Sequence, residues 1–139
     1  MANAIYPYYK EALLWGAADS ALNGSGDAGL HAALVNLTPG GYTYSNTHQF
    51  FSDLTTVVGE PMEVTNVTGY GGLIAGDDVM FPALTGAAVQ AIVLFRKNAG
   101  PSTTWRLVAY LDTGINGVPL TPAGVDVTVS WDPQGIVQL

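Results

Sequence analysis

Short runs of apolar residues, separated by turns rich in glycine and proline, dominate the sequence. The run Leu30 to Leu37, "LHAALVNL", is mostly apolar and carries no charge, which is typical of a strand buried on both faces. Two β-rich runs, Val89 to Phe95 and Trp105 to Leu111, flank the loop Asn-Ala-Gly-Pro-Ser-Thr. This spacing predicts an antiparallel hairpin.

The other strand signals are shorter and alternate between apolar and polar positions. "EPMEVTNVTGY" from Glu60 points Met62, Val64 and Val67 inward, and Val79 to Phe81 forms a strand after an acidic loop. Near the end of the chain, we expect one face to carry Val125, Val127, Val129 and Trp131, followed by a terminal strand from Ile136 to Leu139. Short strands at close spacing predict an all-β, mainly antiparallel fold, either a β-sandwich or a jelly roll.

Helical spacing is confined to two places. "YPYYKEALLWGA" predicts a helix within residues 1–16, with Pro7 in its first turn and Tyr6, Tyr9 and Leu13 on one face. A second, short helix is predicted over "THQFFSDL", capped by Ser45 or Asn46. The glycine-rich stretch between the first helix and Leu30 predicts a flexible loop.

Composition narrows the possible functions. The 139 residues suit one domain spanning 1–139. Hydrophobic residues make up 48% and charged residues only 11%, so much of the surface is neutral, as in a subunit packed against neighbours. A net charge of −7 with four basic residues argues against nucleic acid as a partner. With no cysteine, thiolate metal sites and disulfides are excluded.

No localisation signal stands out in the sequence. The first residues do not combine a basic region with an apolar stretch, so no secretory signal is expected. No apolar run reaches the roughly 20 residues that span a bilayer, so we expect no membrane partner.

Candidate chemical groups are few. Asp77 and Asp78 could hold a cation, but the pair matches no calcium loop and is better explained as a strand-connecting turn. His31, inside an apolar run, and His48, beside Phe50 and Phe51, are expected to pack against neighbours rather than to act in catalysis. No glycine-rich phosphate loop is present. We therefore expect no catalytic residues, no metal and no cofactor.

Aromatic residues are the better candidates for binding. Tyr6, Tyr8, Tyr9 and Trp15 gather in the terminal segment, and Tyr42, Tyr44 and Tyr70 lie near turns. Large aromatic side chains are enriched at the centres of protein interfaces, so these residues are candidate interface anchors. Arg96 and Lys97, at the hairpin tip, are candidate ion-pair donors to a neighbouring subunit, although a solvated turn fits equally well. Exposed aromatic rings also leave carbohydrate binding open.

Several blocks of the sequence, taken in order, resemble small virion structural proteins of tailed bacteriophages and prophages. The blocks are "YPYYKEALL", "HAALVNL", "YTYSNTHQFFSDL", "AGDDVMFPALTG", "AIVLFRKN" and "RLVAYLDT…GVPLTPAGVDVTVSWD…GIVQL". The resemblance extends over nearly the whole chain and rests on the sum of the blocks. The chain departs from it at "GAADSALNGSGDAG", where the loop is longer.

The resemblance implies a non-enzymatic particle component, and within that class a capsid decoration, or cement, protein. Its partners would be the major capsid protein and copies of itself, as a homodimer or homotrimer, at the capsid surface of a virion whose proteins are made in the host cytoplasm. The N-terminal helix and the C-terminal strand are the expected contacts. A neck, tail or fibre accessory protein is the alternative within the particle. A carbohydrate-binding module is the alternative from another class, and an enzyme is the third.

Overall fold

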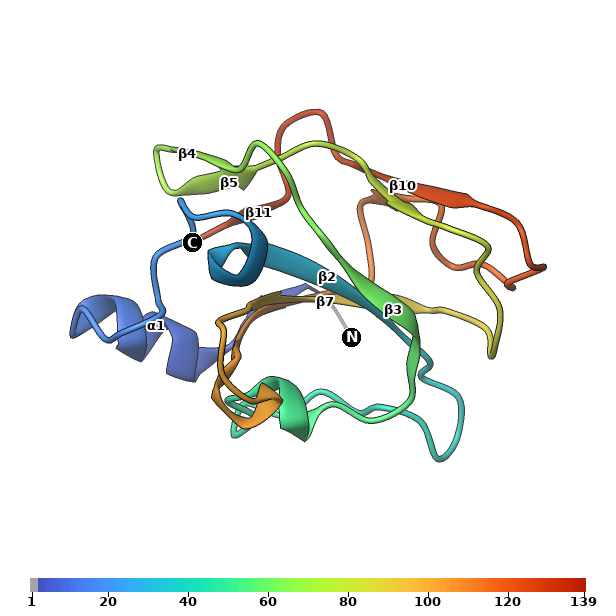
Figure 1. Cartoon of the computed structure of the whole chain (residues 1–139), viewed down its shortest axis with the longest axis horizontal. Coiled ribbons are helices and arrows are strands. Elements are labelled where there is room, and N and C mark those ends of the chain that lie inside the picture. The colour runs from blue at the N-terminus through green and yellow to red at the C-terminus, as the bar shows by residue number, and fades with distance from the viewer. Residues whose placement is uncertain (1–2) are drawn as a thin grey trace.

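The computed structural model describes residues 3–139, which form three antiparallel sheets, one α-helix and three short 3-10 helices (Figure 1). The helices are α1 (Pro7–Leu14), η1 (Gly26–Ala28), η2 (Phe51–Asp53) and η3 (Ser102–Thr104). The strands are β1 (Ala4–Ile5), β2 (Leu30–Val35), β3 (Val57–Glu63), β4 (Thr68–Tyr70), β5 (Leu73–Ala75), β6 (Val79–Phe81), β7 (Ala91–Arg96), β8 (Arg106–Leu111), β9 (Ile115–Asn116), β10 (Val127–Trp131) and β11 (Val137–Gln138).

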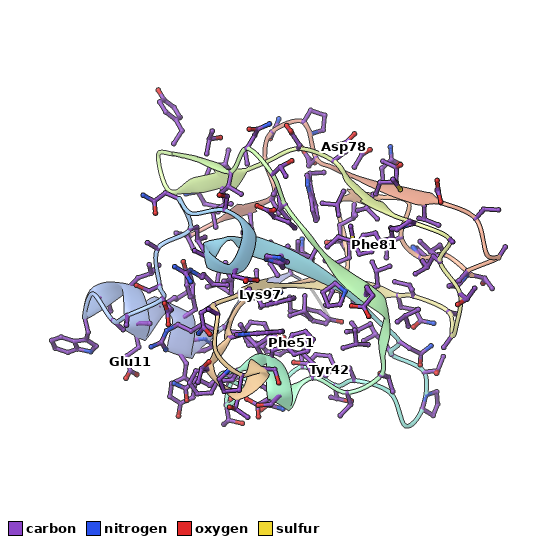
Figure 2. The ribbon with its side chains drawn as sticks, viewed as in Figure 1. Glu11, Tyr42, Phe51, Asp78, Phe81 and Lys97 are labelled. Atoms are coloured by element: carbon purple, nitrogen blue, oxygen red, sulfur yellow. The ribbon has the colours of Figure 1, made fainter. Side chains whose placement is uncertain are left out.

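The largest sheet lies in the middle of the molecule. Its strand order is β1-β8-β7-β2-β3, and two three-stranded sheets, β6-β10-β9 and β11-β5-β4, lie together on one side of it (Figure 1). Segments that carry η2 and η3 cover the opposite side. Figure 2 shows the same division, with Phe81 on the side of the small sheets and Tyr42 and Phe51 on the other.

Burial follows directly from this layering. Strand β2 is buried at every position, and β7 and β8 are buried at every position except the adjoining Arg96 and Arg106. A strand covered on both faces needs apolar residues at successive positions rather than alternate ones, which is why these runs lack a polar face. β7 and β8 pair in antiparallel register, so the predicted hairpin is confirmed.

One continuous core joins the three sheets. Ile74 of β5, Val79 of β6 and Val129 of β10 belong to the same buried cluster as the central strands. Val64 is buried in it, and Met62 and Val67 pack against it as predicted. The all-β, mainly antiparallel class is therefore confirmed, and the arrangement is sandwich-like, with small sheets opposing a larger one.

Three predicted elements need correction. The terminal segment is not helical throughout, because Ala4–Ile5 pair with β8 before the helix begins at Pro7; residues 1–2 lie outside the described part. The second helix is reduced to η2, since the Asp53 carboxylate accepts the backbone N–H groups of Gln49 and Phe50 and closes the chain into a tight turn. Val125 precedes β10 and is exposed rather than inward.

Candidate interaction surface

Helix α1 ends in a well-formed cap that fixes the direction of the following residues. Gly16, with φ of +58°, adopts the left-handed conformation that glycine tolerates without a steric cost. Its N–H donates to the Leu13 carbonyl at 3.2 Å, and the Ala17 N–H donates to the Ala12 carbonyl at 2.9 Å. This pair of bonds defines the Schellman motif, so Trp15 is held on an ordered turn.

The two faces of α1 differ sharply in exposure. Tyr9 and Ala12 are buried, whereas Leu14 is 82% exposed and Trp15 is 81% exposed. The inward face is further held by Tyr9, whose hydroxyl donates to the Ser20 carbonyl at 2.7 Å. Burial raises the pKa of Tyr9 to about 12, against smaller lowering effects of Arg96 and Arg106. The helix is thus anchored on one side, and its C-terminal end presents Leu14 and Trp15 to solvent, beyond the exposed Lys10 and Glu11.

A groove opens beside this helix. It has a volume of about 270 Å³, and its apolar lining includes Tyr9 and Leu13 of α1, Leu22 of the following loop, Ile74 of β5 and Leu139. None of the side chains that line it is charged. The groove therefore suits an apolar group rather than an ion.

Strand β4 borders the same groove and is exposed at all three positions. It lies at the edge of its sheet, at the same end of the molecule as α1 (Figure 1). Tyr70, at its end, is 89% exposed. Exposed large apolar side chains grouped with a groove mark interaction surfaces on soluble proteins. We call α1, the groove and β4 together the apolar end.

Charge is unevenly distributed relative to the apolar end. All four basic residues and four of the eleven acidic residues belong to α1 or to segments bonded to the loop that follows it: Lys10, Arg96, Lys97, Arg106, Glu11, Asp19, Asp27 and Glu63. The other seven acidic residues lie on segments without Lys or Arg: Asp53, Glu60, Asp77, Asp78, Asp112, Asp126 and Asp132. Figure 2 shows Glu11 at the apolar end and Asp78 far from it. The net charge of −7 thus resides outside the apolar end.

Three of the predicted interface aromatics lie in the core, which corrects the prediction. Tyr6, Tyr9 and Tyr42 are buried. The Tyr6 and Tyr42 hydroxyls lie 2.7 Å apart, and the Tyr42 hydroxyl lies 2.8 Å from Nδ1 of His48. Tyr6 and Tyr42 are therefore held inside the core by their hydroxyl network, whereas Tyr9 bonds to the Ser20 carbonyl and contributes only to the floor of the groove.

The remaining predicted anchors have mixed placements. Trp15 is strongly exposed and Tyr8 is partly exposed. Tyr44 is half-buried, with its ring centroid 5.1 Å from that of Tyr6 and 5.5 Å from that of Tyr110. Of these three, Trp15 offers the largest free surface.

The basic pair at the hairpin tip bonds within the chain. Arg96 lies 3.4 Å from the Asp19 carboxylate and donates from Nε to the Ala21 carbonyl. Lys97 lies 3.0 Å from Asp27, above the ring of Trp105. Both residues hold the loop after α1 in place, so the expected flexible loop is tied to the hairpin at several points.

Asp77 and Asp78 occupy the turn before β6, where the sequence placed them. Asp77 accepts from Asn66 Nδ2 at 2.6 Å, and Asp78 accepts from Ser130 Oγ at 3.1 Å. Within residues 3–139, no three side chains of the metal-binding types converge on a common point. The two carboxylates tie adjacent loops together.

The two histidines do not meet. His31 is buried on β2, its Nδ1 lies 3.1 Å from the Gly29 carbonyl, and its ring packs against Phe95. Burial lowers the pKa of His31, partly offset by its bond to Gly29. His48 belongs to the tyrosine network beneath the sheet. Each therefore has a packing role in the structure.

A second surface feature surrounds Trp131 of β10. The indole N–H donates to the Asp77 carbonyl at 2.8 Å, which fixes the ring. Hollows of about 220 and 320 Å³ adjoin it, and both are lined by Trp131, Asp132 and Pro133. Asp78 lines the first and Asn116 the second. An immobilised ring with carboxylate and amide groups nearby is a plausible setting for a polar ligand with an apolar face.

Comparison with known proteins adds no assignment. Neither the models of known protein families nor the curated proteins give a match to this sequence. In the part of the chain that the structure covers, no helix has the length and hydropathy needed to cross a membrane. The candidate surfaces are therefore defined by the geometry of the chain itself.

The sequence did not reveal the groove, since its lining comes from distant segments. It did contain a signal for the exposed helix face: "LLW" at Leu13 to Trp15 places three large apolar residues in succession. Because successive residues on a helix are about 100° apart, they cannot all share the inward face of Tyr9.

Proposed function

We propose that this protein is a non-enzymatic structural component of a bacteriophage virion, most specifically a capsid decoration protein that binds the outer shell and stabilises the head. The observation that carries the proposal is the apolar end, where Leu14, Trp15 and Tyr70 are each more than 80% exposed. A surface of this kind is costly to leave in water. It is suited to contacts between subunits of a particle.

The sequence blocks that resemble small virion proteins supply the particle context, and the low charge content agrees with it. The partners proposed are the major capsid protein and further copies of the chain. Binding only to the assembled shell shifts the equilibrium toward that shell by mass action. A subunit made in the host cytoplasm and then held at the capsid surface would meet these requirements, and a neck, tail or fibre position remains the alternative within the particle.

The test is to add purified protein to capsids that lack it and to count bound copies by cryo-electron microscopy. We expect ordered copies on the shell, with Leu14 and Trp15 in contact regions. Density at the neck or tail instead would favour the alternative position. No binding to any part of the particle would contradict the proposal.

The contact surface is tested by the double variant Leu14→Ser, Trp15→Ser. A tryptophan at the centre of an interface can contribute about 2 kcal/mol or more, so we expect shell affinity to fall at least tenfold. Met80→Ser, at an exposed apolar residue of β6, is the matched control. Deleting the first fifteen residues would be a poor test, because it removes the buried Tyr6 and Tyr9 and would disturb the core.

Carbohydrate binding is the second candidate, and we centre it on Trp131, one of the tryptophan and tyrosine residues that could stack on a sugar. A fixed indole beside the carboxylates of Asp78 and Asp132 can stack on the apolar face of a sugar. The two carboxylates can then accept hydrogen bonds from the hydroxyl groups of the sugar. A glycan array followed by titration would identify a ligand, and Trp131→Ala should abolish its binding. Binding that survives this substitution, or an array with no ligand, would remove the candidate.

A further inference from the structure

We infer that the apolar end joins two copies of this chain about a two-fold axis, with Trp15 of each copy inserted into the groove of the other. This inference concerns the isolated protein in solution, where the apolar end meets a second copy instead of a shell subunit. The occupant assigned to the groove is thus a second copy of the same surface.

The projecting side chain and the groove are neighbours. Leu13 lines the groove and Trp15 follows it by two residues. A two-fold rotation about an axis close to the helix end interchanges the two features, so both contacts form together. Interfaces of this type are self-complementary and close after two subunits.

The groove is large enough to hold an indole ring. An engineered apolar cavity of about 150 Å³ holds benzene, so a groove of about 270 Å³ has room for an indole ring. The Schellman cap keeps Trp15 on a defined turn, which reduces the conformational entropy that is lost when its ring is buried.

The apolar side chains exposed at this end provide contact area for an interface. A large aromatic side chain buries about 150–250 Å², so Trp15 and Tyr70 together offer on the order of 400 Å² per copy. A specific interface buries about 800 Å² per partner. The other apolar side chains exposed at this end, Tyr8, Leu13, Leu14 and Leu139, extend the surface toward that size.

The distribution of charge favours contact through the apolar end. Contact through the apolar end joins the parts of two copies where acids and bases balance. It also keeps Asp78 of one copy away from the contact, since Figure 2 shows Asp78 far from Glu11 of α1. Contact through any of the acidic regions would bring like charges together at an energetic cost.

The inference is tested by sedimentation equilibrium over a range of protein concentrations. We expect a monomer–dimer equilibrium that stops at two subunits. Trp15→Ala removes the inserted ring, and Gly69→Leu adds a side chain at the groove, where a Cβ would meet open space and no strained φ is required. Each variant should dissociate at least tenfold more readily than the parent, while Met80→Ala should not.

A mixing experiment separates insertion of Trp15 from general stickiness. Trp15→Ala retains a groove and Gly69→Leu retains the ring, so a heterodimer of the two variants restores one of the two contacts. The mixture should associate more strongly than either variant alone. Tryptophan emission of the parent should also shift to shorter wavelength on association, because Trp15 passes from water into the groove.

A monomer at every concentration, a trimer, or an open series of larger species would overturn the inference. Dimers that Trp15→Ala leaves unchanged, or variants that fail to complement each other, would also overturn it. A monomer that still decorates capsids through Leu14 and Trp15 would refute the dimer and support the proposed function. A dimer that binds no particle would support the dimer and contradict the proposed function.

Discussion

At the residue scale, the buried hydroxyls beneath the central sheet connect the N-terminal segment to the segment between β2 and η2. Tyr6, Tyr42 and His48 form a chain of two hydrogen bonds. Burial, together with the bond to Tyr42, raises the pKa of Tyr6 far above its usual range. Burial also raises the pKa of Tyr42 to about 12, although its bond to Tyr6 lowers it. Both hydroxyls therefore stay neutral and serve to satisfy one another.

Tyr42→Phe should lower the free energy of unfolding by about 1–3 kcal/mol, because it leaves the buried Tyr6 hydroxyl without its partner. Urea denaturation measures the change. Tyr8→Phe is the matched control, since Tyr8 is partly exposed on α1 and should change stability by less than about 0.5 kcal/mol. Equal effects of the two substitutions would show that the network contributes nothing.

His31 should make stability depend on pH on the acidic side of neutrality. Its pKa is lowered in the folded state by burial, and Lys97 lowers it further, against the opposite effects of Gly29, Glu63 and Asp27. Because the unfolded histidine, with a pKa of about 6.5, takes up a proton first, stability is full above that pH and falls as pH decreases toward the folded pKa.

His31→Gln should reduce the slope of the free energy of unfolding against pH in this range, by at most about 1.4 kcal/mol per pH unit. The measurement is the free energy of unfolding in urea between pH 7.5 and 5, taken as about one unit above and 1.5 units below the free histidine pKa. His48→Gln removes the other histidine and serves as the control. A variant profile as steep as that of the parent would exclude His31 as the source.

At the element scale, local backbone requirements and packing decide where helices and strands end. Gly16 terminates α1 because its φ of +58° suits glycine. The central strands β2, β7 and β8 persist because both of their faces are covered. The segment expected to form a second helix instead forms a tight turn, because the Asp53 carboxylate accepts hydrogen bonds from the backbone N–H groups of Gln49 and Phe50.

Two glycine substitutions should have opposite effects. Gly16→Ala forces a side chain into the left-handed region and should cost about 1 kcal/mol. Gly69→Ala places a methyl group in open space on a strand without a positive φ and should be neutral or stabilise by up to about 1 kcal/mol. Thermal unfolding of both variants tests the pair, and a Gly16→Ala protein as stable as the parent would contradict the assigned cap.

The turn at Asp77 and Asp78 should behave as a structural connection rather than a cation site. Replacing both residues with alanine removes bonds to Asn66 and Ser130 and should destabilise the fold by about 1 kcal/mol. Calcium should leave the Tm of the parent unchanged. A calcium-dependent rise in Tm that the double variant loses would instead establish a metal site.

At the scale of the whole molecule, the three most exposed large apolar side chains among the described residues, Leu14, Trp15 and Tyr70, lie at the apolar end, and seven of the eleven acidic residues lie on other segments. The four basic residues lie on α1 and on the β7–β8 hairpin, where Arg96 and Lys97 pair with Asp19 and Asp27, and seven acidic residues lie on segments without Lys or Arg. This polarity gives the molecule one end suited to contact and a remainder that repels its own copies.

Moderate salt should raise the Tm, by a few degrees at most, because it screens repulsion among the seven carboxylates. Glu60→Gln combined with Asp132→Asn should reduce that response, since both residues belong to this set. Glu11→Gln, next to Lys10 on α1, is the control and should leave the response unchanged or increase it. A parent whose Tm falls with salt would show that its ion pairs outweigh the repulsion.

The sequence by itself determined the elements whose signals are local. Alternation, apolar runs and turn residues predicted the all-β class, the β7–β8 hairpin and the helix that begins at Pro7. Steric limits on the backbone and the burial of apolar side chains act within a few residues, so such features can be read from the chain. The turn at Asp77 and Asp78 belongs to the same group.

Only the tertiary structure decided which aromatic residues are free. Tyr6 and Trp15 are similar in chemistry and lie on the same short segment, yet one is fully buried and the other is 81% exposed. The difference arises because residues distant in sequence, such as Tyr42, cover the first and leave the second uncovered. The groove and the separation of charge have the same origin, since each depends on which distant segments the fold places side by side.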